Sequence, residues 1–218
     1  MEFTSISATI QGLAAYTQSH KHDEPKLEGE NADDYDRRTW RSKMNTQPTG
    51  RQKPGPKDGE MVPELAMIIP AFGIHDALVK AAQHSQLKIV GQRYATWTAK
   101  FKSGIGMIGP AVINVDPDSI VIPTVLSMNA DGKRGSGARV TRRFPQIPPG
   151  WLATFEAMIL DPVITEKIFR LMLERAGLYI GVGQYRPEVG GSNGRFRVHD
   201  VVWTDKRELV PYGINAAA

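Results

Sequence analysis

The chain has 218 residues, with 41% hydrophobic and 23% charged side chains, values typical of a globular domain. It contains no cysteine, which excludes disulfide scaffolds, thiolate metal sites and cysteine nucleophiles. No apolar run approaches the roughly 18 residues of a membrane span, and the N-terminus lacks a signal-peptide pattern, so we expect a cytoplasmic protein that does not bind membranes.

The net charge of +4 is unevenly distributed. Residues 1–36 hold eight acids and two bases, whereas residues 37–57 hold seven bases and no acid. Residues 131–143 hold five bases and one acid. Basic charge gathered into loops is typical of polyanion-binding proteins; the alternative is solvated loops without a partner.

The N-terminal half begins with a strand. Ile6, Ala8 and Ile10 alternate with polar residues, the pattern of a strand with one buried face. Residues 18–63 have few aliphatic side chains and much charge, proline and glycine, so they cannot fill a core. We expect them to form a long insertion that is mobile alone or ordered by a partner.

Past Pro70, residues 71–86 place Phe72, Ile74, Leu78, Ala81 and Ala82 on one helical stripe. Strands are predicted at 104–115, 119–129, 139–144 and 151–160, with a basic, glycine-rich turn between the second and third.

The last third is predicted to contain a second helix, with Thr165 as its N-cap and Gly177 as its C-terminal stop. Residues 178–183 then return as a strand, a glycine-rich loop follows, and residues 195–203 form the final strand. The chain is therefore predicted to be one α+β domain over 1–218. Its βαββαβ order indicates a ferredoxin-like or RRM-like antiparallel sheet with a long basic insertion after the first strand. Helices would cover one face and leave the other free for a ligand.

Two short motifs resemble those of a known family. Residues 69–78 (IPAFGIHDAL) place a proline turn before the first helix, and residues 190–198 (GGSNGRFRV) form a glycine-rich loop before the last strand. In this order they resemble the RAMP (repeat-associated mysterious protein) superfamily of CRISPR systems, especially its backbone-subunit branch. The resemblance implies an RRM-like domain that grips single-stranded nucleic acid, forms homo-oligomers along the strand and contacts other subunits of a ribonucleoprotein complex. A stand-alone, phage-encoded relative fits it equally well.

The main hypothesis is therefore weakly sequence-specific binding of single-stranded RNA or DNA through basic loops and the glycine-rich loop. The choice between RNA and DNA stays open, because it depends on contacts to the 2′-hydroxyl. The predicted binding residues are Arg37, Arg38, Trp40, Arg41, Lys43, Arg51, Lys53, Lys57, Lys100, Lys102, Lys133, Arg134, Arg139, Arg142, Arg143, Arg186, Gly190, Gly191, Gly194 and Arg195.

Aromatic side chains close to these bases are candidates for base stacking. Trp40 lies among arginines and has few apolar neighbours in sequence, whereas Trp97 and Phe101 are spaced so that packing on a helix face is an equal alternative. Trp151, Phe155 and Trp203 fall in apolar strands and are expected in the core.

Catalysis has only isolated candidates. The resemblance draws attention to Asp33, Asp34 and Asp36, because some backbone subunits cut RNA with a loop aspartate; three carboxylates could also hold Mg²⁺. His75, beside Asp76, is the candidate general acid or base. The alternatives are a solvated acidic surface and a helix-end histidine. We predict no cofactor and no metal site. The competing functions are a phage structural or inhibitory protein that binds an acidic protein partner, and a RAMP-type endoribonuclease.

Overall fold

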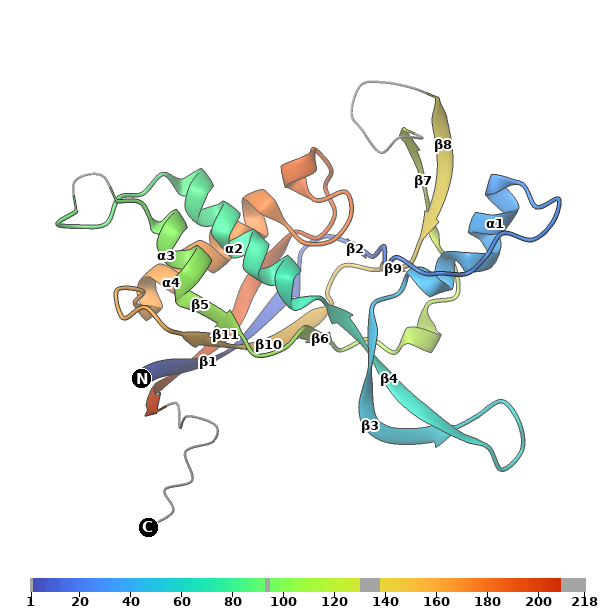
Figure 1. The fold of residues 1–218 in the computed structure, drawn as a ribbon, viewed down its shortest axis with the longest axis horizontal. Helices are drawn as coiled ribbons and strands as arrows, with labels where there is room; N and C mark the ends of the chain where they lie inside the picture. The colour runs from blue at the N-terminus through green and yellow to red at the C-terminus, as the bar shows by residue number, and fades with distance from the viewer. Residues whose placement is uncertain (1, 93–94, 130–137, 209–218) are drawn as a thin grey trace, which may run out of the picture.

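The computed structural model describes residues 2–92, 95–129 and 138–208 (Figure 1). Lys133 and Arg134, two of the predicted binding residues, lie outside these ranges. In chain order the strands and helices are β1 (Glu2–Gly12), β2 (Tyr16–Thr17), α1 (Ala32–Thr39), β3 (Thr46–Pro54), β4 (Met61–Ile69), α2 (Ala71–Ser85), α3 (Trp97–Gly104), β5 (Ile105–Met107), β6 (Ala111–Ile113), β7 (Thr124–Asn129), β8 (Arg139–Phe144), β9 (Gln146–Ile147), β10 (Leu152–Ile159), α4 (Glu166–Arg175) and β11 (Phe196–Glu208).

A seven-stranded sheet organises the molecule. Its strands follow the order β11, β1, β10, β6, β4, β3, and β5 also pairs with β10. Every one of these pairs is antiparallel. Two small pairs, β2 with β9 and β7 with β8, lie outside the sheet. The predicted α+β class with a mainly antiparallel sheet is confirmed.

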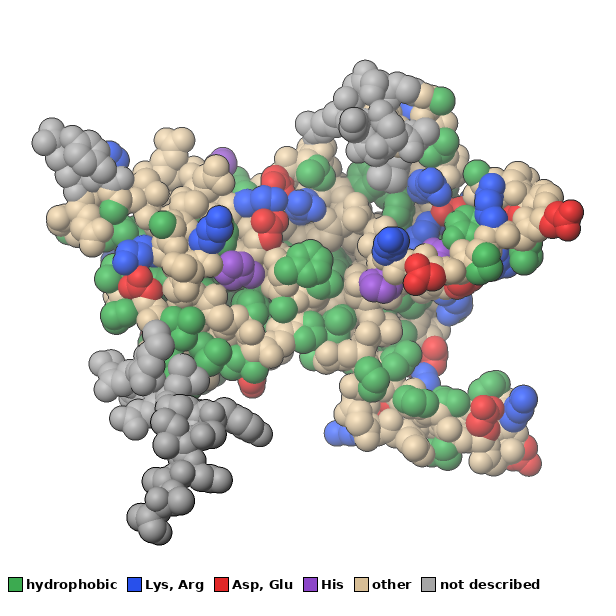
Figure 2. Space-filling model, in the orientation of Figure 1, with side chains coloured by type: hydrophobic (Ala, Val, Ile, Leu, Met, Phe, Trp, Pro, Cys, Tyr) green, Lys and Arg blue, Asp and Glu red, His purple; other side chains and the backbone are tan. Residues whose placement is uncertain are grey.

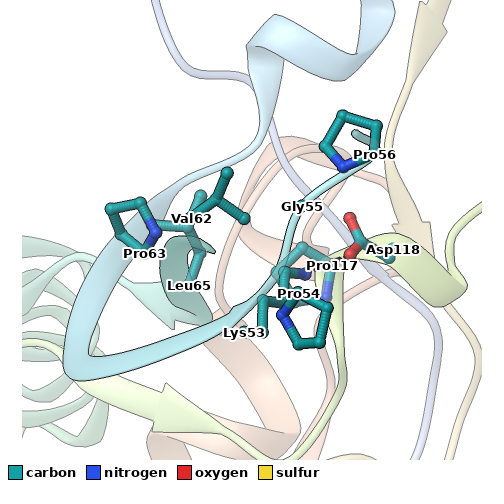
Figure 3. Close-up of a pocket in the computed structure, with 9 residues that line it drawn as sticks. All are labelled: Lys53, Pro54, Gly55, Pro56, Val62, Pro63, Leu65, Pro117 and Asp118. Atoms are coloured by element: carbon teal, nitrogen blue, oxygen red, sulfur yellow. Dashed lines mark hydrogen bonds and ion pairs between the residues drawn. The ribbon is translucent and has the colours of Figure 1, made fainter. Parts of the chain in front are cut away.

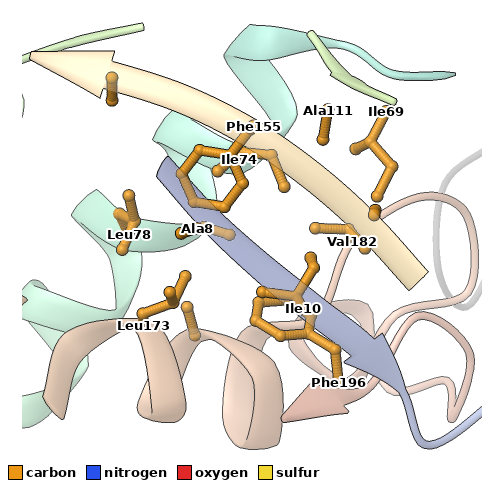
Figure 4. Packing of buried hydrophobic residues seen from close by; sticks show 14 of the residues in the cluster. Ala8, Ile10, Ile69, Ile74, Leu78, Ala111, Phe155, Leu173, Val182 and Phe196 are labelled. Atoms are coloured by element: carbon orange, nitrogen blue, oxygen red, sulfur yellow. The ribbon is translucent and has the colours of Figure 1, made fainter. Parts of the chain in front are cut away.

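The core lies between one face of this sheet and the helices α2, α3 and α4 (Figures 1 and 4). Ala8 and Ile10 of β1 and Phe155 of β10 face Leu78 of α2 and Leu173 of α4, and all five are at most 1% exposed. Burying a large apolar side chain of this kind contributes about 1.5–3 kcal/mol, so the alternating strands and the helices stabilise one another.

Local sequence signals explain where the two long helices begin. Pro70, with φ of −53°, ends β4 and precedes α2, because its ring preselects a backbone angle compatible with a helical start. Thr165 caps α4, its hydroxyl accepting a hydrogen bond from the N–H of Ile168. Both predicted helices are confirmed. None of the helices in the described ranges is long and apolar enough to cross a bilayer.

The other face of the sheet is polar at its centre, with exposed Val112 of β6 and Val202 of β11 beside the polar residues. Ser7 and Thr9 of β1 and Thr154 and Glu156 of β10 alternate with the buried residues, and the hydroxyls of Thr9 and Thr154 are 2.9 Å apart. RRM-type recognition stacks bases on aromatic side chains of the sheet. These central strands present hydroxyls there instead, so the helix side carries the better candidate site.

The expectation that residues 18–63 lack core contacts is wrong for part of this segment. Trp40, in the short 3₁₀ turn Trp40–Lys43, is 8% exposed and belongs to the core cluster. Strand β4 starts within the segment and joins the main sheet through β6, with β3 at its outer edge. The insertion is therefore a structural part of the domain.

The expected strand at 178–183 is also wrong. Residues Ala176–Ile180 form a π-helical turn that continues directly from α4. Gly177 lies inside this turn rather than beyond a helix end, and a Cβ there would overlap the carbonyl oxygen of Phe196. The close approach of β11 explains the glycine better than helix termination does.

Candidate nucleic-acid interface

Two turns that are distant in sequence meet beside α2. The Pro70 turn (residues 69–73) connects β4 to α2, and the glycine loop (residues 181–195) connects the π-helical turn to β11. Residues of both turns line a hollow of about 150 Å³, which also borders β2. We call this space the hollow. The lining thus comes from the Pro70 turn and from residues 181–186 at the start of the glycine loop, whereas the motif at 190–198 contributes no lining residue.

The glycines of this loop serve its own folding. A Cβ at Gly191 would overlap the carbonyl oxygen of Tyr185, and a Cβ at Gly194 would overlap that of Val182. Gly190 and Gly194 have φ of +77° and +68°, backbone angles that residues other than glycine rarely adopt. The prediction that Gly191 and Gly194 approach a nucleic-acid backbone therefore needs correction, because their Cα atoms face this chain's own backbone.

The ionic groups at the edge of the hollow pair with one another. Lys80 contacts both Asp76 and Glu188 at 2.7 Å. Arg186 also contacts Glu188, and it donates to the carbonyl of Gly183 at 3.1 Å. Two bases thus face two acids, so this edge holds balanced charge. Arg195, another predicted binding residue, donates to the carbonyl oxygen of Leu178.

The hairpin of β7 and β8 adjoins the glycine loop. The hydroxyl of Tyr185 donates to the carbonyl of Ser127 on β7 at 3.4 Å. Tyr185 has φ of +58°, a strained angle for a residue with a side chain. Burial raises the pKa of the Tyr185 hydroxyl, and the charge of Arg139, an exposed residue of β8, lowers it. The hairpin therefore contacts the glycine loop at Tyr185 and carries an exposed cation.

Acidic and basic side chains of the insertion form ion pairs on α1 and on the segment that precedes it. Arg37 binds Asp33 at 2.8 Å, and Arg38 binds Glu30 at 3.0 Å and Glu24 at 3.1 Å. Hydrogen bonding to Arg38 lowers the pKa of Glu30. Contacts first to Arg143 and then to Arg37 likewise lower the pKa of Asp33. Figure 2 shows acidic and basic side chains close together over α1.

Trp40 and Lys43 are not available to a ligand, which corrects two predictions. Trp40 packs into the core, with the exposed Arg41 guanidinium 4.9 Å from its ring centre. The ammonium of Lys43 contacts the fully buried carboxylate of Asp36 and donates to the carbonyl of Arg143 at 2.8 Å. The N–H of Arg143 donates to the same carboxylate. A buried charge needs such partners, so this cluster locks α1 to β8.

The turn end of the β3–β4 hairpin borders a different, larger cavity (Figure 3). Its volume is about 600 Å³, and prolines 54, 56, 63 and 117 are prominent in its lining. The ammonium of Lys53 pairs there with Asp118. Arg51 and Lys57 are exposed elsewhere on this hairpin. The lining is mainly apolar, so the cavity itself offers little to a phosphate.

Of the two predicted binding residues on α3, one forms an ion pair and the other is exposed. Lys100 contacts Asp161 at 2.8 Å, and Lys102 is exposed. Trp97 and Phe101 are 6% and 0% exposed, so packing explains them better than base stacking. Figure 1 places α3 at the opposite end of the molecule from α1. The structure therefore does not gather all predicted bases into one patch.

The catalytic candidates do not form a site. Asp36 is buried in the cluster with Lys43, while the carboxylate of Asp34 accepts from Asn31 at 2.6 Å. His75 is half-buried on α2, and the adjacent Asp76 is paired with Lys80. Within the described ranges, histidines, aspartates and glutamates form no group of three that could hold a metal ion.

Phe72 was assigned to the wrong side of its helix. It is 76% exposed and lines the hollow, whereas Ile74 is 1% exposed. Residues two positions apart lie about 200° apart around an α-helix, so Phe72 and Ile74 cannot share one stripe. That spacing is the sequence signal that could have identified Phe72 as a surface residue.

No protein-family model matches the sequence, and no curated protein matches it. Among solved structures, the chain is similar to a chain in the cryo-EM structure of the Type III-B Cmr-beta complex bound to cognate target RNA, with 13% identity and a TM-score of 0.40. That alignment covers 93% of this chain and 61% of the other, so this chain spans about three fifths of its length. It is also similar to a chain of a Type IV-B CRISPR complex, with 12% identity, a TM-score of 0.44, and coverage of 96% and 95%.

Proposed function

We propose that this protein binds single-stranded nucleic acid, RNA or DNA, along the side where the hollow meets the β7–β8 hairpin. The observation that carries the proposal is the meeting of the Pro70 turn and the glycine loop around one hollow, beside a hairpin with exposed positive charge. Phosphate contacts would supply most of the affinity and little sequence specificity.

Surplus positive charge supports this placement. Near the base of the hairpin, Arg37, Lys43, Arg142 and Arg143 form ion pairs with the carboxylates of Asp33 and Asp36, and Asp34 also acts on Arg37. Four cations against three anions leave one positive charge uncompensated in this group. Arg142 is 40% exposed and lies 3.6 Å from a carboxylate that Lys43 already occupies, so its guanidinium can take a phosphate.

We interpret the core as ferredoxin-like. Strands β11, β1, β10 and β5 or β6 are antiparallel neighbours in that order, with α2 and α4 on one face, which is the arrangement of a split βαβ fold. Strands β4 and β3 extend it. Together with the meeting of the Pro70 turn and the glycine loop at the hollow, this supports a RAMP-like protein. On this interpretation, copies assemble side by side along the strand, and other ribonucleoprotein subunits are candidate partners.

The test is fluorescence anisotropy with labelled single-stranded RNA and DNA and the matching duplexes, at 50–200 mM salt. A triple variant, Arg41→Gln, Arg139→Gln and Arg142→Gln, removes three exposed guanidinium groups. At roughly 0.7 per phosphate for single strands, it should reduce the magnitude of the log–log salt slope by about 2. Lys167→Gln, which removes an exposed cation on α4, is the control and should leave the slope unchanged.

Three results would contradict the proposal. The first is the absence of binding to any strand at low salt. The second is an unchanged salt slope in the triple variant, which would place the phosphates elsewhere. Tighter binding to duplexes than to single strands would also exclude a single-strand-binding protein.

A further inference from the structure

The side chains that line the hollow suit a small, flat ligand with a polar edge. Its apolar lining includes the buried ring of Tyr16 and the buried side chain of Val182. Phe72 also lines the hollow, and 76% of its surface is exposed. An aromatic ring left open to water beside an apolar recess provides a stacking platform.

The polar part of the lining consists of the amides of Gln18, Asn45 and Gln184, the hydroxyl of Ser19 and the charged groups of Asp76 and Arg186. Across the described part of the chain, the side-chain amides of Asn45 and Gln184 have no hydrogen-bond partner. The amide of Gln18 differs, because it donates to the carbonyl of Ile68 and accepts from the N–H of Asn45, both at 2.8 Å. Asn45 and Gln184 therefore each keep a donor and an acceptor for a ligand.

The size of the hollow limits the ligand. A volume of about 150 Å³ equals roughly five waters at about 30 Å³ each. It lies below the 300–1,000 Å³ or so of ordinary small-molecule pockets, so it suits one flat heterocycle rather than a base pair. The exposed Arg139 on the adjoining hairpin can hold a neighbouring phosphate.

We propose that the hollow takes a single unpaired nucleobase of the bound strand, stacked on Phe72 with its polar edge toward Asn45 and Gln184. This inference rests on the proposed function and adds a base-binding subsite to a backbone-directed interface. Unpaired bases are the part of a single strand that can leave the stack and enter such a recess.

The test compares two labelled 12-mers with equal numbers of phosphates, one carrying adenine at every position and one fully abasic. Phe72→Ala should weaken binding of the adenine strand by about 5- to 150-fold, the effect of losing one stacked base. Binding of the abasic strand should not change. Phe72→Trp should retain affinity for the adenine strand.

The control is Tyr179→Ala, which removes another exposed aromatic, 54% exposed and stacked on His84 near the other end of α2. It should affect neither strand. Thermal melting checks the fold of each variant. The inference is overturned if Phe72→Ala leaves the adenine strand unaffected, or weakens both strands equally. If the wild-type protein binds neither strand, the proposed function falls, and this subsite with it.

Discussion

The buried pair of Asp36 and Lys43 provides the sharpest test of how the insertion is held. Asp36 is 0% exposed, and its carboxylate contacts the ammonium of Lys43 and the N–H of Arg143. Lys43→Met removes the ammonium while keeping most of the side-chain volume. The carboxylate then stays buried with one backbone donor and the more distant guanidinium of Arg142, 3.6 Å away.

Breaking a buried ion pair from one side typically costs about 3–5 kcal/mol, because the remaining charge is left without compensation. For a chain of this size, each kcal/mol lowers Tm by about 2–4 °C. We therefore expect Lys43→Met to lower Tm by about 6–20 °C. The loss of the cation–π contact between Lys43 and Phe144, now 4.9 Å from ammonium to ring centre, acts in the same direction.

Thermal and urea unfolding, followed by circular dichroism, measure this loss. The double variant Asp36→Asn with Lys43→Met removes both charges, and its amide oxygen still accepts from the N–H of Arg143. It should recover much of the stability lost in Lys43→Met alone. Arg37→Met is the control, since its pair with Asp33 is exposed and should contribute little. An unchanged Tm in Lys43→Met would refute the claim that this pair holds the insertion to the domain.

Three further predictions follow from the geometry. Gly191→Ala should cost about 1–3 kcal/mol of unfolding free energy by overpacking, whereas Gly109→Ala, with open space around it, should be neutral in the same urea titration. The pKa of Asp161 lies below its ordinary 3.8, chiefly because Lys100 donates a hydrogen bond to its carboxylate. The wild type should therefore lose stability as the pH falls below 3.8, and Asp161→Asn should lose less. Thermal melting at pH 7, 4 and 3 measures this difference. Glu30→Gln weakens the hold on the Arg38 guanidinium and should steepen the salt slope of strand binding by roughly 0.7; an unchanged slope would show that Arg38 meets no phosphate.

Several elements could be predicted from sequence because their signals are local. The alternation at Ile6, Ala8 and Ile10 defines the buried face of β1, and all three are at most 1% exposed. Pro70 and Thr165 mark the starts of α2 and α4 through their own backbone angle and hydroxyl. Such signals act within one or two turns of chain, so the sequence shows them directly.

The site depended on contacts between distant segments. The Pro70 turn and the glycine loop were recognised as motifs, but only the fold places them around one hollow. Lys43 was predicted to bind nucleic acid because it lies in a basic run, yet its buried carboxylate partner and the β8 backbone, 100 residues away, hold it inside.

The sequence by itself determined the α+β class, the strand alternation and the helix starts, since each is set by propensity and periodicity over a few residues. Tertiary structure alone decided which of the basic residues reach solvent and which are held by carboxylates of the insertion. The physical reason is that burial and ion pairing depend on positions in space rather than spacing along the chain. Bases of the same run, residues 37–43, therefore differ in exposure: Arg41 is exposed, and Lys43 is buried.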